Sequence, residues 1–447
     1  MKKEQDFTNG KIMGPLLRFA LPVFFALCLQ TMYGAVDLLI VGQYAQTFDV
    51  SAVSTGTFVM HLLTSAVTGL AMGTTVQIGQ KIGEKRTHEV GGIIGSSTVL
   101  FLAFGLVLTV LMQFLAPFIS KLMQAPNEAF DATVSYIRIC SAGAIFIVAY
   151  NVIGSIFRGM GNSAIPLLTV AIACVVNIVG DYVLVAVFDM AAAGAAIATV
   201  AAQAVSVVLS LIIVRKKKLV RIRKEDWKPK KALIMRTIHI GLPIAFQDVL
   251  VTMSFMVIAG IVNGLGVVAS AGVGIAEKIC GFIMLVPSAF SQSISAFVAQ
   301  NIGAGKRERA NLALKYAILT SLAVGVVIGY FSFFHGDMLT AIFAGDKQDV
   351  IQAGAEYLKA YAIDCLFVSF LFCFTGYFNG CGNTRFVMVQ GIIGAFAVRI
   401  PISFLMSRLF PESLFLIGLA TPSSTVVQII CCAVFMRRCL KKQKLFE

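Results

Sequence analysis

The chain has 447 residues, of which 58% are hydrophobic and only 13% are charged, and its mean hydropathy is +0.87. Soluble globular domains carry about 25% charged residues, so this composition excludes them and indicates a polytopic membrane protein. The first apolar run exceeds the roughly 7–15 residues of a signal-peptide core, so no cleaved signal peptide is expected.

Twelve long apolar segments follow one another from end to end. Each reaches the ~20 residues that a helix needs to cross a hydrocarbon core of about 30 Å. The segments are residues 19–42, 51–79, 92–118, 134–157, 165–188, 192–214, 238–262, 268–298, 313–334, 352–378, 386–406 and 414–436. The sequence therefore predicts an all-α polytopic membrane protein with 12 transmembrane helices.

The basic residues indicate which loops face the cytoplasm. With the N-terminus inside, 29 of the 36 lysines and arginines lie in or beside the inner segments, as the positive-inside rule requires. Both termini are expected in the cytoplasm, with the chain in the plasma membrane. The run RKKKLVRIRKEDWKPKK at 215–231 is interpreted as a connector that faces anionic lipid, so membrane lipids are expected partners and nucleic acid is not.

The two halves of the chain resemble each other in three places. An offset of 220 or 221 residues relates ALP (20–22) to GLP (241–243), QKIG (80–83) to QNIG (300–303), and RGMGNS (158–163) to NGCGNT (379–384). Six spans in each half make the repeats parallel, as in transporter lobes around a central cavity. We therefore predict a first lobe (1–214), a cytoplasmic linker (215–236) and a second lobe (237–447). Because the cavity lies within one chain, a monomer is expected.

The sequence contains no motif for nucleotide hydrolysis. The pattern G-x-x-x-x-G-K-[ST] does not occur, and the four histidines lack metal-ligand spacing. Energy for transport must then come from an ion gradient or from the substrate's own gradient. A transporter is predicted that is not an enzyme and has no cofactor besides its coupling ion.

A carboxylate, Asp37, lies well inside the first span. A charged side chain at that depth costs about 2.5–3.5 kcal/mol on insertion scales, so a retained one is expected to have a function. In the fifth span Asn177 and Asp181 are four residues apart and share one helix face. Ala195 and Thr199 repeat the spacing in the sixth span, which must pack closely on the fifth because its connector is short.

These polar groups could bind the coupling ion. Oxygen ligands suit Na⁺, and two nearby carboxylates suit a shared proton equally well. The candidate ligands are Asp37, Asn177, Asp181 and Thr199. Structural alternatives are an interhelical hydrogen bond for Asn177 and a helix-backbone hydrogen bond for Thr199. Gln30 and Tyr33, on the helix face of Asp37, either line a ligand pocket or pack against neighbours.

The spans of the second half contain charges of both signs. They are Asp248, Glu277, Lys278, Asp364 and Arg399. We expect structural ion pairs among them. In contrast, no basic residue lies in the interior of the first six spans, so Asp37 is not expected to have a salt-bridge partner.

Together these features resemble the multidrug and toxic compound extrusion (MATE) family over essentially the full chain. The resemblance rests on the two six-span repeats, the ALP…D segment, the inner loops VQIGQKIGEKR and AQNIGAGKRERA, the RGMGN and NGCGN turns, and the N-x-x-x-D and A-x-x-x-T pairs. It implies the MATE fold, with two pseudo-symmetric lobes that alternate access. It also implies export of cationic or amphipathic drugs in exchange for H⁺ or Na⁺.

The resemblance also implies roles for individual residues. The cation or proton site would comprise Asp37, Asn177, Asp181, Thr199 and the carbonyl group of Ala195. The substrate would contact an overlapping set of residues: Gln30, Tyr33, Asp37, Asn177 and Asp181.

Two further positions bear on the resemblance. Pro22 matches the proline at which the first helix of the family is proposed to bend. Some branches carry cation-site acids midway along helices seven and ten. In this chain the middle of the seventh span, Leu250–Phe255, contains no acidic residue, and Asp364 lies earlier in the tenth span than such a cation site requires. Both observations favour the DinF-like branch.

Two other functions fit parts of the sequence. A lipid-linked oligosaccharide flippase of the same superfamily would share the helical plan. It would need a large cationic cavity for pyrophosphate, and the first half lacks interior lysines and arginines. An intramembrane enzyme or a receptor would belong to a different class, and no nucleophile motif or soluble catalytic domain supports one.

Overall fold

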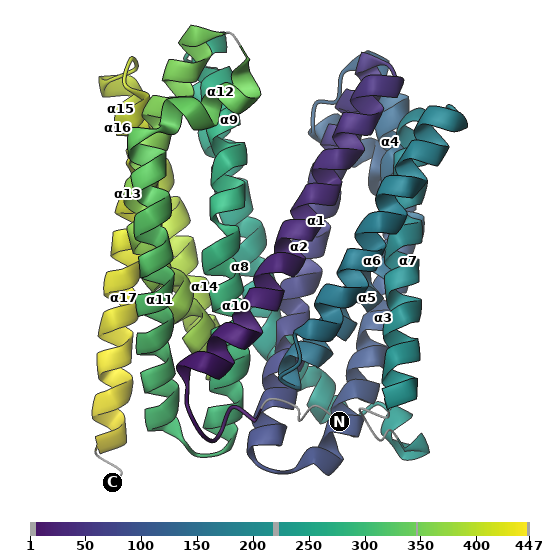
Figure 1. The fold of residues 1–447 in the computed structure, drawn as a ribbon, viewed down its shortest axis with the longest axis vertical. Coiled ribbons are helices and arrows are strands. Elements are labelled where there is room, and N and C mark those ends of the chain that lie inside the picture. The colour runs from purple at the N-terminus through teal and green to yellow at the C-terminus, as the bar shows by residue number, and fades with distance from the viewer. Residues whose placement is uncertain (1–5, 218–222, 346, 445–447) are drawn as a thin grey trace. The chain divides into compact units, whose positions relative to one another are not determined.

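A computed structural model describes residues 6–217, 223–345 and 347–444 (Figure 1). Within these ranges the chain forms helices joined by short turns, and it contains no β-strand. The predicted all-α fold class is confirmed.

The first half of the chain contributes seven α-helices and three short 3-10 or π segments. They are α1 (Met13–Tyr44), α2 (Thr47–Gly83), η1 (Thr87–Glu89), α3 (Val90–Leu122), η2 (Asn127–Ala129), α4 (Phe130–Ala142), α5 (Ala144–Gly159), α6 (Ala164–Asp181), η3 (Tyr182–Val187) and α7 (Ala191–Lys217).

The second half contributes ten α-helices and two short segments to the described structure. They are η4 (Lys224–Trp227), α8 (Lys231–Asn263), α9 (Val267–Ile283), α10 (Leu285–Gly303), α11 (Arg307–Phe334), α12 (Gly336–Ala344), α13 (Gln348–Gly380), α14 (Thr384–Ile392), η5 (Ile393–Arg399), α15 (Ile400–Leu409), α16 (Leu414–Gly418) and α17 (Ala420–Lys444).

Eleven described helical segments are long and apolar enough to cross a membrane. A twelfth crossing results if α4 and α5, which meet at a bend of 52°, count as one span. The bend lies at Gly143, where a Cβ atom would come within 2.3 Å of the Val200 side chain on α7. The span predicted over 134–157 is therefore two helices that meet at a bend. Glycine at this position has no Cβ atom, so the Val200 side chain of α7 can lie directly against its backbone.

The helices α6 and α7 form the close hairpin that the small residues predicted. They run side by side in Figure 1, joined by the π segment η3 and a short turn. A Cβ atom at Gly180 would lie 3.1 Å from the Ala198 side chain, and one at Gly194 would lie 3.1 Å from the Leu184 backbone. Small side chains thus set the distance between the two helices that carry most of the predicted ligands.

The chain divides into two compact units. The first comprises residues 1–9, 17–245 and 299–306, and the second comprises 10–16, 246–298 and 307–447. The chain therefore changes unit five times: before α1, within α1, α8 and α10, and at the start of α11. The division into lobes at 1–214 and 237–447 stays a prediction.

The predicted linker over 215–236 contains helical structure at both ends. The helix α7 continues to Lys217, and α8 begins at Lys231. Between them, residues 218–222 lie outside the described residues, and η4 packs on α3 so closely that a Cβ atom at Gly95 would lie 1.9 Å from the Asp226 carbonyl oxygen. The described part of the linker is thus held against the first unit.

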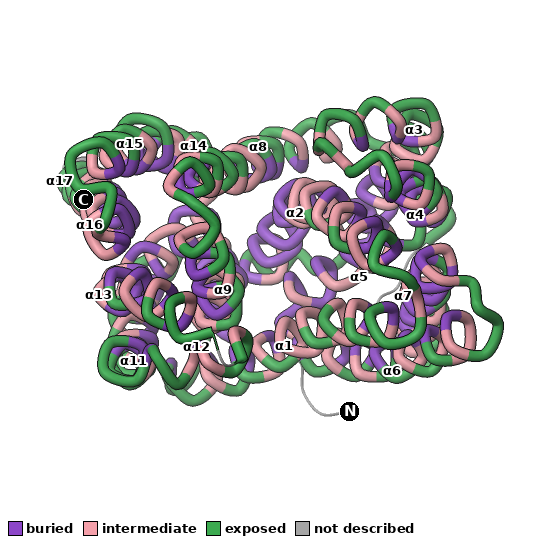
Figure 2. Tube along the Cα trace, turned by 90° about the horizontal axis from the view of Figure 1, so that it is seen from above, coloured by how far each residue is buried: buried purple, intermediate pink, exposed green. Residues whose placement is uncertain are grey.

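The inner half of α2 is the most enclosed helical stretch of the first unit. Every residue from 69 to 80 is buried, and Figure 2 shows this burial as a continuous purple stretch. Close neighbours explain it, because a Cβ atom at Gly73 would lie 2.3 Å from the Thr237 carbonyl oxygen, and one at Gly83 would lie 1.9 Å from that of Gln300. Glycines in α2 therefore let α8 and the end of α10 pack directly on its backbone.

The segment before α1 is anchored in the first unit by Phe7. Its ring is 0% exposed and lies edge-on to Phe19, with 5.3 Å between the centroids. Its backbone N–H donates to Gln300 Oε1 at 3.4 Å, and its carbonyl oxygen accepts from Asn301 Nδ2 at 3.2 Å. Lys306 Nζ donates to the next carbonyl oxygen along the segment at 2.8 Å. Residues near position 300 thus fix the N-terminal segment.

Replacing Gly376 with alanine is expected to lower the thermal stability of the protein. A Cβ atom there would lie 2.3 Å from both the Ser291 carbonyl oxygen and the Ile294 side chain, and overpacking costs about 1–3 kcal/mol or more. The measurement is the melting temperature in detergent, with Gly274→Ala as control, since a Cβ atom at Gly274 meets nothing within 4 Å. Equal melting temperatures for the two variants would contradict this packing of α13 on α10.

Candidate functional site

The carboxylate that the sequence singled out is buried within the first unit. Asp37 lies in the second half of α1 and is 3% exposed. Most neighbouring residues on α1 are half-buried or exposed. The side chain of Asp37 therefore points into the unit, away from its surface.

Two helices bring the predicted partners to Asp37. The helix α6 supplies Asn177 and Asp181, both 0% exposed, and both side chains are polar neighbours of the Asp37 carboxylate. The helix α7 supplies Thr199, whose hydroxyl group donates to Asp37 Oδ2 at 3.3 Å. The four side chains predicted as ligands thus lie together.

The site holds more polar atoms than its own hydrogen bonds satisfy. Among the described residues, Asp37 Oδ1, both carboxylate oxygens of Asp181 and both polar atoms of the Asn177 side chain lack a partner of good hydrogen-bond geometry. Buried polar groups left in that state are costly, and an unpaired buried carboxylate is costlier still. The arrangement can be satisfied by a proton on the carboxyl pair or by a cation among the oxygens.

The residues behind the site are small and fully enclosed. Ala195, one turn before Thr199, is 0% exposed and packs in a core cluster with Val41 and Val53. Its assignment as a carbonyl ligand stays a prediction. The interhelical hydrogen bond considered as an alternative for Asn177 has no partner of good geometry among the described residues, whereas the Thr199 hydroxyl bonds to Asp37 rather than to its own helix.

The two predicted substrate contacts on α1 have partners of their own. Gln30 Nε2 donates to the Tyr150 hydroxyl oxygen at 2.5 Å. The Tyr33 hydroxyl oxygen accepts from Gln203 Nε2 at 3.2 Å. Their role in substrate binding stays a prediction.

Sequence reasoning missed three residues around the site. Gln203 could have been found, because it follows Thr199 by four residues and so shares its helix face. Tyr136 on α4 is an electrostatic neighbour of Asp37 and has room because residue 56 on α2 is glycine. Neither Tyr136 nor Tyr150 stands in any local pattern that would have indicated a role.

The first helix continues through its proline without interruption. The helix α1 extends from Met13 to Tyr44 with Pro22 inside it. Proline there has no N–H to donate to the preceding turn, which makes the helix easier to bend at that point. The hinge at Pro22 stays a prediction.

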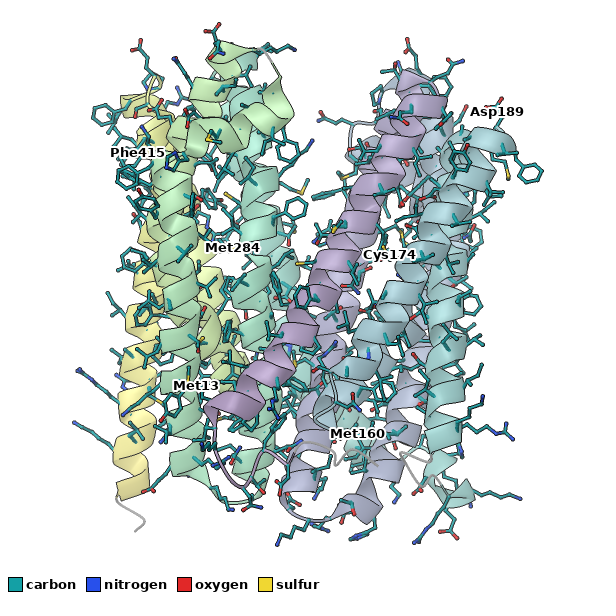
Figure 3. The ribbon with its side chains drawn as sticks, in the orientation of Figure 1. Met13, Met160, Cys174, Asp189, Met284 and Phe415 are labelled. Atoms are coloured by element: carbon teal, nitrogen blue, oxygen red, sulfur yellow. The ribbon has the colours of Figure 1, made fainter. Side chains whose placement is uncertain are left out.

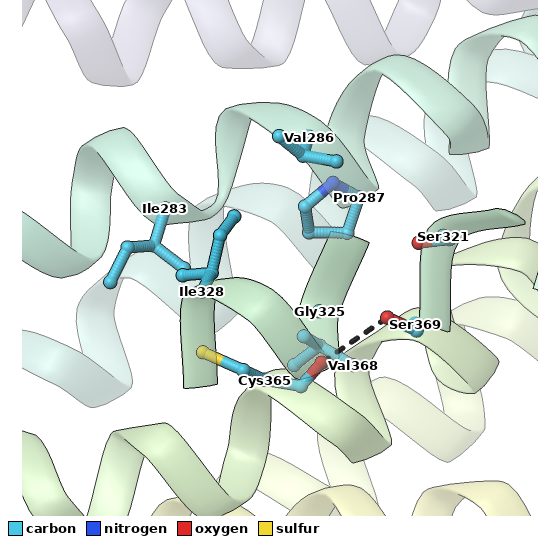
Figure 4. A pocket seen from close by; sticks show the side chains of 9 residues that line it. All are labelled: Ile283, Val286, Pro287, Ser321, Gly325, Ile328, Cys365, Val368 and Ser369. Carbon is cyan, nitrogen blue, oxygen red and sulfur yellow. Dashed lines mark hydrogen bonds between the residues drawn. The ribbon is translucent and has the colours of Figure 1, made fainter. Parts of the chain in front are cut away.

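Two cavities among the described residues do not involve the predicted ligands. One, of about 330 Å³, is lined by residues of the first unit. These are Thr8, Asn9, Gly83, Glu84, Lys85, Gly303, Ala304 and Lys306. The other, in the second unit, has a volume of about 10 Å³ between α9, α10, α11 and α13 (Figure 4), which is about one water-sized sphere.

The ion pairs expected in the second half do not form. All five residues are described, and no ion pair within 4.0 Å joins any of them. Arg399 instead donates to Ser254 Oγ at 3.0 Å and lies 4.3 Å above the Phe255 ring. The prediction was wrong because charged side chains of neighbouring spans need not come within ion-pair distance, and a guanidinium group can also bind a hydroxyl group and an aromatic face.

Comparison with known proteins agrees with this architecture. The MatE family model matches residues 22–183 and again 243–405. The two matches begin at Pro22 and Pro243, the prolines that the internal repeat aligned. Family membership and the duplication thus rest on the same two stretches of the chain.

Individual relatives cover nearly the whole chain. The probable multidrug resistance protein YpnP of Bacillus subtilis (strain 168) is 26% identical over 91% of this chain and 91% of its own length. The multidrug export protein MepA of Staphylococcus saprophyticus is 23% identical over 92% of this chain and 91% of its own.

A solved structure shares the fold. The crystal structure of MATE in complex with MaL6 superposes with a TM-score of 0.92 at 19% identity, and the match covers 99% of this chain and 100% of that one. Figure 3 marks Cys174 on α6, an electrostatic neighbour of Asp37, in the part of the helix that also carries Asn177. By its two matches to the family model and by its fold, this chain belongs to the MatE family of multidrug and toxic compound extrusion (MATE) transporters.

Proposed function

We propose that this protein is a secondary antiporter that exports cationic or amphipathic drugs in exchange for H⁺ or Na⁺. The carboxyl pair of Asp37 and Asp181 is the single observation that carries the proposal. Both residues are buried, and no lysine, arginine or histidine lies within 4.0 Å of either among the described residues. The names of the relatives support drug export as the direction of transport.

Competition for negative charge couples the two fluxes. Two adjacent carboxylates in a medium of low dielectric constant cannot both remain ionised without a cation beside them. A proton, a sodium ion and the positive charge of a drug all meet this need, so each one weakens the binding of the others. Binding of H⁺ or Na⁺ from outside thus releases the drug, and loss of that ion to the cytoplasm allows the next drug to bind.

The ligand set defines which ions are suitable. The proposed ligands are the carboxylate, amide and hydroxyl oxygens of Asp37, Asn177, Asp181 and Thr199, together with the Ala195 carbonyl group that the family resemblance implies. Hard cations such as Na⁺ prefer oxygen ligands, and a carboxyl pair also holds a single proton well. Gln30 and Tyr33 extend this polar surface along α1 toward the substrate, and Pro22 is the hinge at which α1 bends.

The remaining assignments follow from the sequence. The protein lies in the plasma membrane as a monomer of the DinF-like branch, with both termini in the cytoplasm. It is a transporter and not an enzyme. The distribution of lysines and arginines supports the orientation, and the eleven or twelve membrane spans support the multi-pass arrangement.

Asp37→Asn is expected to reduce drug efflux to the level of protein-free vesicles, since the amide can neither bind a proton nor attract a cationic drug. Ethidium efflux from proteoliposomes measures this effect, with ΔpH and ΔNa⁺ imposed separately. The control is Asp189→Asn, the same substitution at an exposed turn whose φ of 54° asparagine tolerates. Full efflux by Asp37→Asn would overturn the proposal, as would a wild-type protein that responds to neither gradient.

Thr199→Val is expected to weaken coupling without removing the carboxyl pair. The variant loses the hydroxyl hydrogen bond to Asp37, and such bonds to charged groups contribute roughly 1.5–3 kcal/mol. The ion concentration for half-maximal efflux should therefore shift by about tenfold or more, whereas Thr199→Ser should keep the wild-type value. If the valine and serine variants behave alike, Thr199 is not part of the ion site.

A further inference from the structure

The cavity of about 330 Å³ in the first unit lies where the two halves of the internal repeat meet. Its lining comes from the N-terminal segment and from the loops that follow α2 and α10. Each loop contributes one lysine, Lys85 from the first and Lys306 from the second. Pockets for small ligands begin at a volume of about 300 Å³. The cavity is therefore large enough to hold a small polar group, and each repeat supplies it with a cationic side chain.

Glycines hold the ends of α2 and α10 in direct backbone contact beside this cavity. A Cβ atom at Gly83 would lie 1.9 Å from the Gln300 carbonyl oxygen. In the same way, a Cβ atom at Gly303 would lie 2.0 Å from the Gln80 carbonyl oxygen. The contact is reciprocal, because residues 80 and 83 correspond to residues 300 and 303 at the repeat offset of 220. It fixes the two lysine-bearing loops on the same cavity.

The backbone N–H groups of both loops are already bonded. Those of residues 84–86 donate to carbonyl oxygens of residues 80–82, with 2.9 Å between donor and acceptor. Those of residues 304–306 donate to carbonyl oxygens of residues 300–302 at 2.8–3.1 Å. These bonds cap the two helices in the same way. A ligand in the cavity would therefore have to be held by side chains.

The acidic side chains near the cavity already have partners. Glu84 Oε2 accepts from Lys81 Nζ at 2.7 Å. The Asp6 carboxylate accepts from the Thr8 backbone N–H and from Asn9 Nδ2, each at 2.8 Å. The negative charges at this end of the unit are thus engaged outside the two lysines of the cavity.

Both lysines retain hydrogens that a ligand could accept. Among the described residues no acid lies within 4.0 Å of Lys85 or Lys306. Lys306 Nζ donates to the Thr8 carbonyl oxygen and to Asn9 Oδ1, each at 2.8 Å, which uses two of its three hydrogens. The groups of the cavity that can still bind a ligand are therefore two ammonium groups, and such groups attract an anion.

We propose that this cavity binds a phosphate group between Lys85 and Lys306. Lysine binds phosphate as a point charge, and two lysines match the negative charge of a phosphate group near neutral pH. The proposed orientation places the cavity on the cytoplasmic side, where the phosphate belongs either to a free compound or to the headgroup of an anionic lipid. Through Lys306 the bound phosphate would connect both loops to the N-terminal segment. The site does not depend on the antiport function.

Lys85→Asn tests the site, because asparagine has no charge and tolerates the φ of 59° at this position. Titration calorimetry with inorganic phosphate in detergent, at constant ionic strength in chloride buffer, measures the Kd. It should rise about tenfold or more in the variant, since one of two charge-assisted contacts is lost. The matched control is Lys121→Asn, at an exposed lysine in the last turn of α3, which should keep the wild-type Kd. Should Lys85→Asn fail to fold, Lys306→Gln takes its place, with the same loss expected.

A second measurement identifies the source of the phosphate. If a lipid headgroup fills the site, nanodiscs of phosphatidylglycerol should raise the melting temperature above that in phosphatidylcholine by about 2 °C or more, and Lys85→Asn should lose this rise. Phosphate binding that depends on Lys85 supports a free compound, and a rise that depends on Lys85 supports the lipid. If neither effect occurs, or if Lys121→Asn reduces it equally, the site is wrong. Neither measurement involves efflux, so the site can fail while the antiport proposal stands.

Discussion

The free-energy cost of holding two carboxyl groups inside an apolar bundle governs how the first unit is built. Asp37 and Asp181 are buried on facing helices, and among the described residues no cationic side chain lies within 4.0 Å of either. Such a pair is tolerable only if a mobile cation or proton visits it, since desolvation of a lone charge costs several kcal/mol. Under the proposed antiport function, stability and ion binding are therefore linked at this site.

The packing of the neighbouring helices places polar side chains beside the Asp37–Asp181 pair. Glycine and alanine bring α6 and α7 close enough to present Asn177, Asp181 and Thr199 from two neighbouring backbones. The first helix adds Asp37 and then a line of polar side chains with partners on α5 and α7. In the second unit the buried Arg399 contacts a hydroxyl group and an aromatic ring, and no acid lies within 4.0 Å of it among the described residues. The two halves thus share a helical plan while their polar interiors differ.

The sequence predicted most of the fold, because hydropathy and length decide which segments can cross a membrane. It also predicted that Asn177, Asp181 and Thr199 would meet Asp37, because four-residue spacing and a short connector are local features. Tyr150 and Tyr136 could not be predicted, since the break of the fourth span at Gly143 and the crossing of helices decide which of their faces turns inward. The ion pairs expected in the second half were predicted wrongly for a similar reason. The sequence shows which charged residues are present, but it does not show which side chains lie beside them in the folded protein.

The burial of Phe7 has a consequence for how the chain is made. Its backbone N–H is bound by a side chain 293 residues further along. At a synthesis rate of about 5–20 residues per second, roughly 15–60 s pass before that partner exists. Throughout that interval the Phe7 ring must stay soluble at the ribosome exit or rest at the membrane interface. The segment around Phe7 is thus among the last to reach its final position.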